Sequence, residues 1–148
     1  MAKQFKTKHI LLAVTLHKSG CSATDARLAI LQYFRRQRQP VSVRQIVEHL
    51  SGTGTGIDQA TVYRTVTAFK AKNIIRQVDL RHNHAHYELA ALAEHHHLVC
   101  TRCGKVEDVA RCDIATIGPA VLRRSKHFVS IEEHSLEFYG VCKACAAK

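Results

Sequence analysis

Apolar side chains recur every three or four positions in four stretches of the first half of the chain, which is the spacing of a helix that packs one face against a core. These stretches cover residues 5–17, 24–38, 42–50 and 59–72. Thr24, Ser42 and Asp58 begin or precede three of them and are residue types that cap helix N-termini. Gln45, three positions after Ser42, completes a capping box. The pattern therefore predicts four helices.

After the fourth helix the pattern changes to short apolar runs, which are typical of strands. Residues 74–80 and 87–90 predict two strands, and the residues between them, 81–86, form the turn of a hairpin or wing. Helices followed by such a hairpin make up a winged helix-turn-helix. The first part of the chain therefore has the expected order of a winged helix.

The last part of the chain predicts a second, smaller α/β unit. Strands are expected within 98–109 and 128–141, with a helix at 113–126 between them. Pro119 falls inside that helix and favours a kink there. The predicted fold class is thus α+β, with a winged-helix domain over 1–90, a hinge at 91–94 and a small α/β domain over 95–148.

Charge is divided unequally between these two parts. The 148 residues carry a net charge of +10, and 46% of them are hydrophobic, enough for one ordinary domain or two small ones. Residues 1–90 hold 14 basic and 5 acidic side chains, whereas residues 91–148 hold 8 and 7. A basic surface attracts polyanions such as nucleic acid. The first part is therefore expected to face nucleic acid.

The N-terminal stretch superficially resembles a signal peptide, because lysines at 3–8 precede an apolar run at 10–16. That run has only seven residues, His17 and Lys18 end it, and no small-residue cleavage pattern follows. No stretch is long enough to span a bilayer. We expect a cytoplasmic protein without a membrane partner, in which cysteines stay reduced.

The cysteines form two matched pairs, Cys100-x-x-Cys103 and Cys142-x-x-Cys145. Two such knuckles are the spacing by which four thiolates surround a tetrahedral zinc ion, and a site filled by four sulfurs is structural. A redox dithiol or a pair of disulfides is less favoured, because a redox motif does not usually occur in two matched copies. Cys21 and Cys112 stand alone and are interpreted as free thiols.

Three consecutive histidines, His95, His96 and His97, come just before the first knuckle. On a strand, His95 and His97 point to one face and His96 to the other, so the run can serve two sites. Composition alone leaves open the alternative that these three histidines are exposed at the surface and bind no metal.

Three separated stretches, 60–64, 95–106 and 134–140, resemble the signature stretches of the ferric uptake regulator family, and they occur in the same order. Gly20, Thr24 and Arg27 match the family's first-helix pattern. The resemblance thus covers nearly the whole chain. It implies a metal-dependent, dimeric transcriptional repressor that binds palindromic operator DNA, and neither an enzyme nor a binder of small-molecule substrates.

The resemblance also implies roles for particular residues. A regulatory divalent metal between the two domains would be bound by Glu88, His95, His97 and Asp108. An additional site in the second domain would use His96 and His134, and the four cysteines would hold structural zinc. The DNA-binding helix would present Gln59, Thr61, Tyr63, Arg64 and Thr67, with Tyr63 reaching thymine and Arg64 phosphate.

The chain departs from the family pattern at several of these positions. Pro40 stands near the place where many members have a regulatory histidine. Glu94 and Ala115 replace a histidine and a glutamate of the additional site, and Ser22 replaces a basic residue that members often insert into the minor groove. The wing instead carries three alternating histidines, which are either exposed or further metal ligands: His82, His84 and His86.

The nitrogen and oxygen donors of the regulatory set suit iron(II), manganese(II) or zinc(II). Iron(II) is favoured, because no cysteine between Cys21 and Cys100 is available for the zinc sensors' usual thiolate ligand. Pro40 also argues against a peroxide sensor, which relies on the missing histidine. A zinc hydrolase or deaminase is disfavoured by the absence of their motifs. A zinc-ribbon nucleic-acid-binding or adaptor protein without a regulatory metal remains the alternative.

Overall fold

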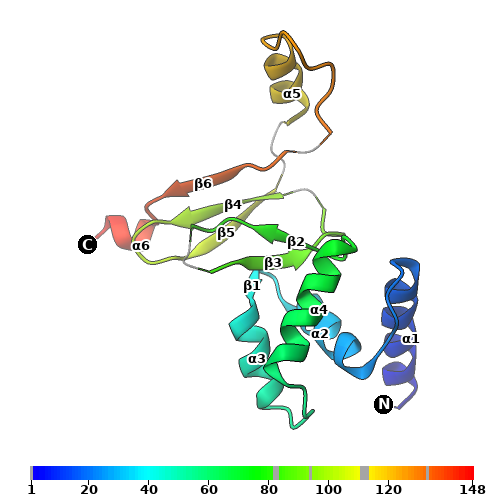
Figure 1. Ribbon diagram of the computed structural model, residues 1–148. Coiled ribbons are helices and arrows are strands. Elements are labelled where there is room, and N and C mark those ends of the chain that lie inside the picture. The colour runs from blue at the N-terminus through cyan, green and yellow to red at the C-terminus, as the bar shows by residue number, and fades with distance from the viewer. Residues whose placement is uncertain (1, 82–83, 94, 111–113, 133) are drawn as a thin grey trace. The chain divides into compact units, whose positions relative to one another are not determined.

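The computed structural model describes residues 2–81, 84–93, 95–110, 114–132 and 134–148. It divides into two compact units, Met1–Leu92 and Ala93–Lys148, and each is described by itself (Figure 1). His82, Glu94 and Cys112, which the sequence singled out, lie outside the described residues. Among the described helices, none has the length and apolar character needed to cross a membrane.

The first unit is built on four helices, as the apolar spacing predicted. They are α1 (Ala2–Lys18), α2 (Asp25–Arg36), α3 (Val43–Ser51) and α4 (Gln59–Ala71). Each contributes side chains to one apolar core, which includes Leu16 of α1, Phe34 of α2, Ile46 of α3 and Phe69 of α4. Burying one such side chain contributes about 1.5–3 kcal/mol, so this core fixes which face each helix leaves exposed.

Three predicted helix caps are confirmed. The Thr24 side chain accepts a hydrogen bond from the Arg27 N–H, and Asp58 Oδ1 accepts one from the Thr61 N–H at 2.6 Å. At α3 the capping box is complete, because Ser42 Oγ accepts from the Gln45 N–H at 3.3 Å while Gln45 Oε1 accepts from the Ser42 N–H at 2.8 Å. These bonds satisfy N–H groups that a helix start leaves without partners.

A small antiparallel sheet closes the first unit. Its strands are β1 (Val41–Ser42), β2 (Ile75–Val78) and β3 (His86–Leu89), in the order β1-β3-β2. The strands predicted at 74–80 and 87–90 are thus confirmed with shifted ends. β1 was not predicted, because two residues are too few to show an alternating pattern. Its pairing of Val41 with Tyr87 and of Ser42 with His86 joins the start of α3 to the hairpin.

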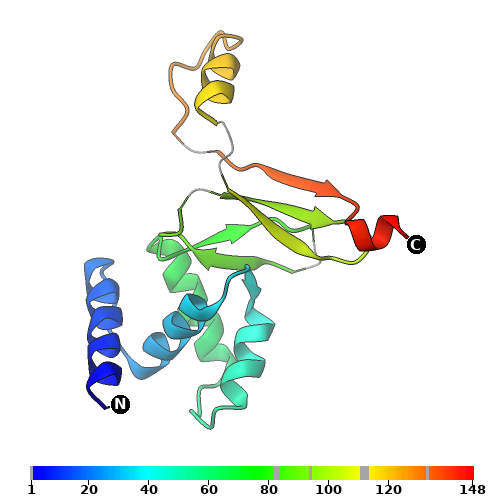
Figure 2. The ribbon, with the colours of Figure 1, turned by 180° about the vertical axis from the view of Figure 1, so that it is seen from behind.

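The second unit contains a three-stranded sheet in which β4 lies between β5 and β6, as Figures 1 and 2 show. Its elements are β4 (His95–Cys100), β5 (Val106–Ala110), α5 (Ile114–Leu122), β6 (Glu137–Gly140) and α6 (Lys143–Ala146). β4 and β5 are antiparallel around a turn that contains Gly104, whose φ of 71° favours glycine. β6 is parallel to β4, so that His97 is opposite Glu137.

Two predictions about this unit were wrong in extent. The strand expected at 128–141 covers only Glu137–Gly140, so His134 does not lie on it. Phe128 and Val129 have strand-forming side chains but are 75% and 95% exposed. Strand propensity reflects the packing of a side chain against its neighbours, and the side chains of Phe128 and Val129 pack against few atoms. The helix predicted at 113–126 ends at Leu122 and contains Pro119.

Candidate metal centres and nucleic-acid interface

The two cysteine knuckles meet at one end of the second sheet. The first begins at the last residue of β4, and the second begins just after β6 and extends into α6. The four sulfur atoms lie within 4.8 Å of one another, and Cys103 Sγ is 3.7 Å from Cys142 Sγ. Zinc–sulfur bonds of about 2.3 Å at tetrahedral angles place two sulfurs about 3.8 Å apart. The four-cysteine cluster therefore fits a zinc ion with no open coordination position.

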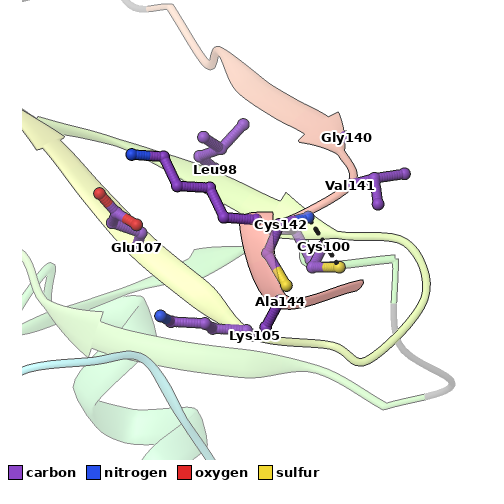
Figure 3. Close-up of a pocket in the computed structure, with 10 residues that line it drawn as sticks. Leu98, Cys100, Lys105, Glu107, Gly140, Val141, Cys142 and Ala144 are labelled. Carbon is purple, nitrogen blue, oxygen red and sulfur yellow. Dashed lines mark hydrogen bonds between the residues drawn. The ribbon is translucent and has the colours of Figure 1, made fainter. Parts of the chain in front are cut away.

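Hydrogen bonds within the cluster shift the pKa values of its thiols in different directions. The Cys142 N–H donates to Cys100 Sγ at 3.3 Å, the bond drawn dashed in Figure 3. This N–H and that of Cys103 lower the pKa of the Cys100 thiol to about 6, because they stabilise the thiolate. Hydrogen bonds with Cys103 and Cys142 raise the pKa of Cys145 to about 12. Zinc binding must displace the protons that the four thiols retain.

A groove runs beside this cluster and gives one side of it access to solvent (Figure 3). Cys100 is buried, Cys142 and Cys145 are half-buried and Cys103 is exposed. Across the knuckles, Arg102 Nη1 donates to the Cys145 carbonyl oxygen at 2.8 Å. This bond ties the two knuckles together independently of a metal, and nothing in the cysteine spacing indicated it.

His97 is the best-buried histidine among the described residues, with 1% of its surface exposed. Its Nε2 is 3.8 Å from Asp108 Oδ1 on the neighbouring strand, and its Nδ1 is 3.1 Å from Glu137 Oε2. The ring of His95, on the same face of β4, has its centroid 4.9 Å from that of His97. Three of the four predicted regulatory residues are therefore gathered on one face of the β4–β5 hairpin.

His95 is held through one ring nitrogen. Its Nδ1 lies 2.7 Å from the Ala93 carbonyl oxygen, which can only accept, so Nδ1 carries the proton of a neutral ring. The lone pair is then on Nε2, the nitrogen with which such a histidine binds metal.

Glu88, the fourth predicted regulatory residue, lies on β3 of the first unit. Its side chain is 4% exposed, and Arg76 Nε on β2 donates to its Oε1 at 2.6 Å. A buried carboxylate is retained in ionised form when a charged partner compensates its desolvation. Arg76 was not predicted, because its role depends on the β2–β3 register that pairs Arg76 with Glu88.

The remaining histidines form two looser pairs. The rings of His96 and His134 have centroids 5.4 Å apart, and His96 Nε2 is buried without a hydrogen-bond partner among the described residues. In the wing, the rings of His84 and His86 have centroids 4.6 Å apart. The structure thus brings together two residues of each additional set that the sequence suggested.

The exposed face of α4 is the candidate nucleic-acid interface. Gln59, Tyr63, Arg64 and Thr67 are exposed and Thr61 is half-buried, whereas Val62 and Phe69 on the opposite face are fully buried. Tyr63 is 50% exposed, so a large part of an aromatic ring that could be buried against a binding partner faces solvent.

A polar depression opens beside the start of α4. Its lining includes Ser22, Thr24, Arg27, Thr61 and Arg64. Arg27 Nη1 donates to the Ser22 carbonyl oxygen at 3.0 Å, and Arg64 Nη2 donates to Thr61 Oγ1 at 3.0 Å. Two guanidinium groups near the N-termini of α2 and α4 suit a phosphate group. Arg27 matched the family pattern in the sequence, but only the fold brings it beside Arg64.

The model of the ferric uptake regulator family matches residues 18–139, which is most of the chain. The chain belongs to the ferric uptake regulator family. The resemblance noted in the sequence is confirmed, and so is the α+β fold class. Members of the family are metal-responsive, DNA-binding transcriptional regulators.

Individual members are similar over almost their full length. The ferric uptake regulation protein of Legionella pneumophila is 31% identical over 131 residues, which span 88% of this chain and 95% of the relative. The ferric uptake regulator of Vibrio cholerae has 30% identity and a TM-score of 0.72, covering 86% of this chain and 97% of that one. The regulator of Pseudomonas aeruginosa with manganese has 27% identity and a TM-score of 0.75, covering 89% and 98%.

Sequence reasoning missed the polar neighbours of the predicted ligands. Glu137 contacts His97 from β6, and Arg76 contacts Glu88 from β2. Glu137 lies inside a signature stretch of the ferric uptake regulator family, so its position was noted but not its role. The signal that could have found it is the parallel pairing of β6 with β4, which no local pattern shows.

Proposed function

We propose that the chain is a metal-dependent, dimeric repressor that binds palindromic operator DNA. A regulatory divalent metal would join the two units through Glu88 of the first unit and His95, His97 and Asp108 of the second. The observation that best supports this proposal is the grouping of the three second-unit donors on one face of the β4–β5 hairpin, with His97 buried among them. Family membership supports the repressor role.

The donors fit a divalent ion of intermediate softness. Two imidazoles and two carboxylates, without a thiolate, suit iron(II), manganese(II) or zinc(II), and we propose iron(II) as the preferred ion. The metal would supply positive charge that neutralises the carboxylates and fixes the direction of each ligand. The four cysteines, Cys100, Cys103, Cys142 and Cys145, would hold a separate structural zinc ion, which their sulfur spacing supports.

The proposed mechanism is selection of one orientation. Two units joined by a short hinge sample several relative orientations, and a metal that binds residues of both favours the one in which all donors reach it. In a two-fold dimer that orientation sets the distance between the two DNA-binding helices. Half-sites on DNA lie about one helical turn, or a multiple, apart, so only one spacing fits.

On DNA, the exposed face of α4 would enter the major groove. Tyr63 would contact a base edge, and Arg64 would hold a phosphate, with Gln59, Thr61 and Thr67 on the same helix beside them. The depression that Arg64 shares with Arg27 supports a phosphate contact at this end of the helix. Phosphate contacts set position, whereas base contacts supply specificity.

Additional metal sites are proposed at the two looser histidine pairs. His96 with His134 would form one, and the wing histidines His84 and His86, with His82, would form the other. The specific observations are the ring separations of 5.4 Å and 4.6 Å. The wing site would supply the donor that Pro40 cannot.

The test is operator binding with and without metal. Zinc-loaded protein is titrated against duplex DNA that carries a palindromic site, in the absence of air, with added iron(II) or manganese(II) or with neither. We expect specific binding only with the added ion. Equal binding in all samples would favour the alternative of a zinc-ribbon nucleic-acid-binding protein without a regulatory metal.

A further inference from the structure

Glu137 makes two contacts with a single residue, His97. Its Oε2 accepts a hydrogen bond from the His97 backbone N–H at 2.9 Å and lies 3.1 Å from His97 Nδ1. The carboxylate is only 13% exposed, and the histidine side chain 2%. A largely covered carboxylate that holds both the backbone and the ring of one histidine fixes the rotation of that ring about its side-chain bonds.

The chemistry of the two groups assigns the ring proton. An ionised carboxylate can only accept hydrogen bonds, so Nδ1 of a neutral His97 ring must donate to Glu137. The lone pair is then on Nε2, and Nε2 is the atom that faces Asp108 at 3.8 Å. Two donors each about 2.1 Å from one ion lie about 3.0–3.4 Å apart, so a slight approach of Asp108 would let both bind it.

We propose that Glu137 is a positioning residue of the regulatory site, which presents Nε2 of His97 to the metal by holding its Nδ1 proton. This inference rests on the proposed role of His97 as a ligand. Carboxylate partners of this kind fix the tautomer and orientation of a metal-binding histidine and make the bound nitrogen more basic. The carboxylate also adds negative charge behind a ligand that must approach a cation.

The position of Glu137 in the fold extends this role. It begins β6, and the same strand leads directly into Cys142 of the second cysteine knuckle. The Thr101 N–H donates to the Gly140 carbonyl oxygen at 2.8 Å, which joins β6 to the first knuckle as well. The orientation of His97 therefore depends on a strand that the four-cysteine cluster anchors.

The test compares Glu137→Leu and Glu137→Gln with a matched control, Glu107→Leu, at an exposed strand position of the same unit. The first variant removes both contacts, the second keeps an acceptor without the charge, and the control removes a carboxylate from a neighbouring strand. Manganese(II) affinity is measured by electron paramagnetic resonance on zinc-loaded protein. We expect affinity to fall about 10–100-fold in Glu137→Leu, less in Glu137→Gln and not in the control.

A second readout does not depend on metal binding. The ring ¹⁵N shifts of His97, measured at mildly alkaline pH without manganese, report which nitrogen carries the proton. We expect the Nδ1–H form in the wild type and in Glu137→Gln, and a mixture of tautomers in Glu137→Leu. Unchanged affinity and unchanged tautomer in Glu137→Leu would overturn the inference.

His97→Ala separates this inference from the proposed function. If His97→Ala lowers manganese affinity but Glu137→Leu does not, the positioning role is wrong and the metal site stands. If His97→Ala has no effect on affinity, the regulatory site is wrong, and the role of Glu137 at that site falls with it. If Glu137→Leu loses zinc, the inference is judged on Glu137→Gln, which retains a hydrogen bond to the ring. A lowered manganese affinity of Glu137→Gln then supports the positioning role, and an unchanged affinity contradicts it.

Discussion

At the scale of single residues, the proposed metal ligands differ in how far along the chain the group that holds each side chain lies. His95 is held by the Ala93 carbonyl oxygen, two positions away, whereas the Nδ1 of His97 is held by a carboxylate 40 positions away. The family resemblance implied which residues would be the donors, and their role as ligands stays a prediction. The groups that orient those donors come from other strands, and the sequence alone did not predict them.

His97→Ala tests the regulatory site. We expect the metal concentration needed for operator binding to rise at least tenfold, because a buried ligand is lost, while zinc content and folding are retained. Fluorescence anisotropy of labelled operator DNA, titrated with metal, measures this change. His127→Ala, at an exposed histidine of the same unit, is the control and should behave as the wild type. An unchanged metal dependence in His97→Ala would contradict the metal clamp.

Cys103→Ser tests the four-cysteine cluster. We expect loss of about one zinc per chain and unfolding of the second unit, because the binding free energy of a structural zinc ion is also folding free energy. Metal analysis and circular dichroism measure the two effects. Cys21→Ala changes a cysteine of the first unit and should keep its zinc. A Cys103→Ser protein that retains both zinc and structure would show that the cluster has another role.

Arg64→Ala and Tyr63→Ala should weaken DNA binding in different ways. Loss of a phosphate contact lowers affinity for all sequences alike and reduces the salt dependence by about one ion. Loss of the tyrosine should reduce discrimination at one A·T position by about 1–3 kcal/mol. Anisotropy titrations at several salt concentrations, on operator and scrambled DNA, distinguish the two. If neither variant differs from wild type, α4 is not the DNA-binding helix.

At the scale of elements, the prediction succeeded where the signal was local. Caps and apolar spacing lie within a few residues, and all four helices of the first unit were predicted from them. The two-residue strand β1 has no such signal. The strand predicted at 128–141 was wrong over most of its length, because its apolar residues suggest a strand whether or not a neighbour pairs with them. Pairing is a tertiary property, and it limited β6 to four residues.

The capping box of α3 gives an element-scale prediction. Ser42→Ala removes the acceptor for the Gln45 N–H at a buried helix start, so we expect the free energy of unfolding to fall by about 1 kcal/mol. Ser51→Ala, at the exposed end of the same helix, should change it by less than about 0.5 kcal/mol. Urea denaturation of the zinc-loaded protein measures both. Equal effects of the two substitutions would mean that the cap contributes nothing specific.

At the scale of the whole molecule, the basic residues and the paired cysteines lie in different parts of the sequence. The excess of basic residues lies in residues 1–90, and the paired cysteines lie after them. Three ordered motifs, at 60–64, 95–106 and 134–140, then indicated the family. The fold class could be predicted because it depends on the order of elements, whereas the parallel β4–β6 pairing joins segments that are remote in the chain. No periodicity within either segment indicates its partner.

That remote pairing has a consequence for synthesis on the ribosome. The first unit is translated completely before β4, and domains generally fold from the N-terminal side as they emerge. Glu137 is synthesised 40 residues after His97, so the His97 ring is held only once that later segment has been made. At about 5–20 residues per second this delay lasts roughly 2–8 seconds. During this interval the nascent chain already carries the basic residues of the first unit, whereas Glu137, the residue that holds the His97 ring, has not yet been made.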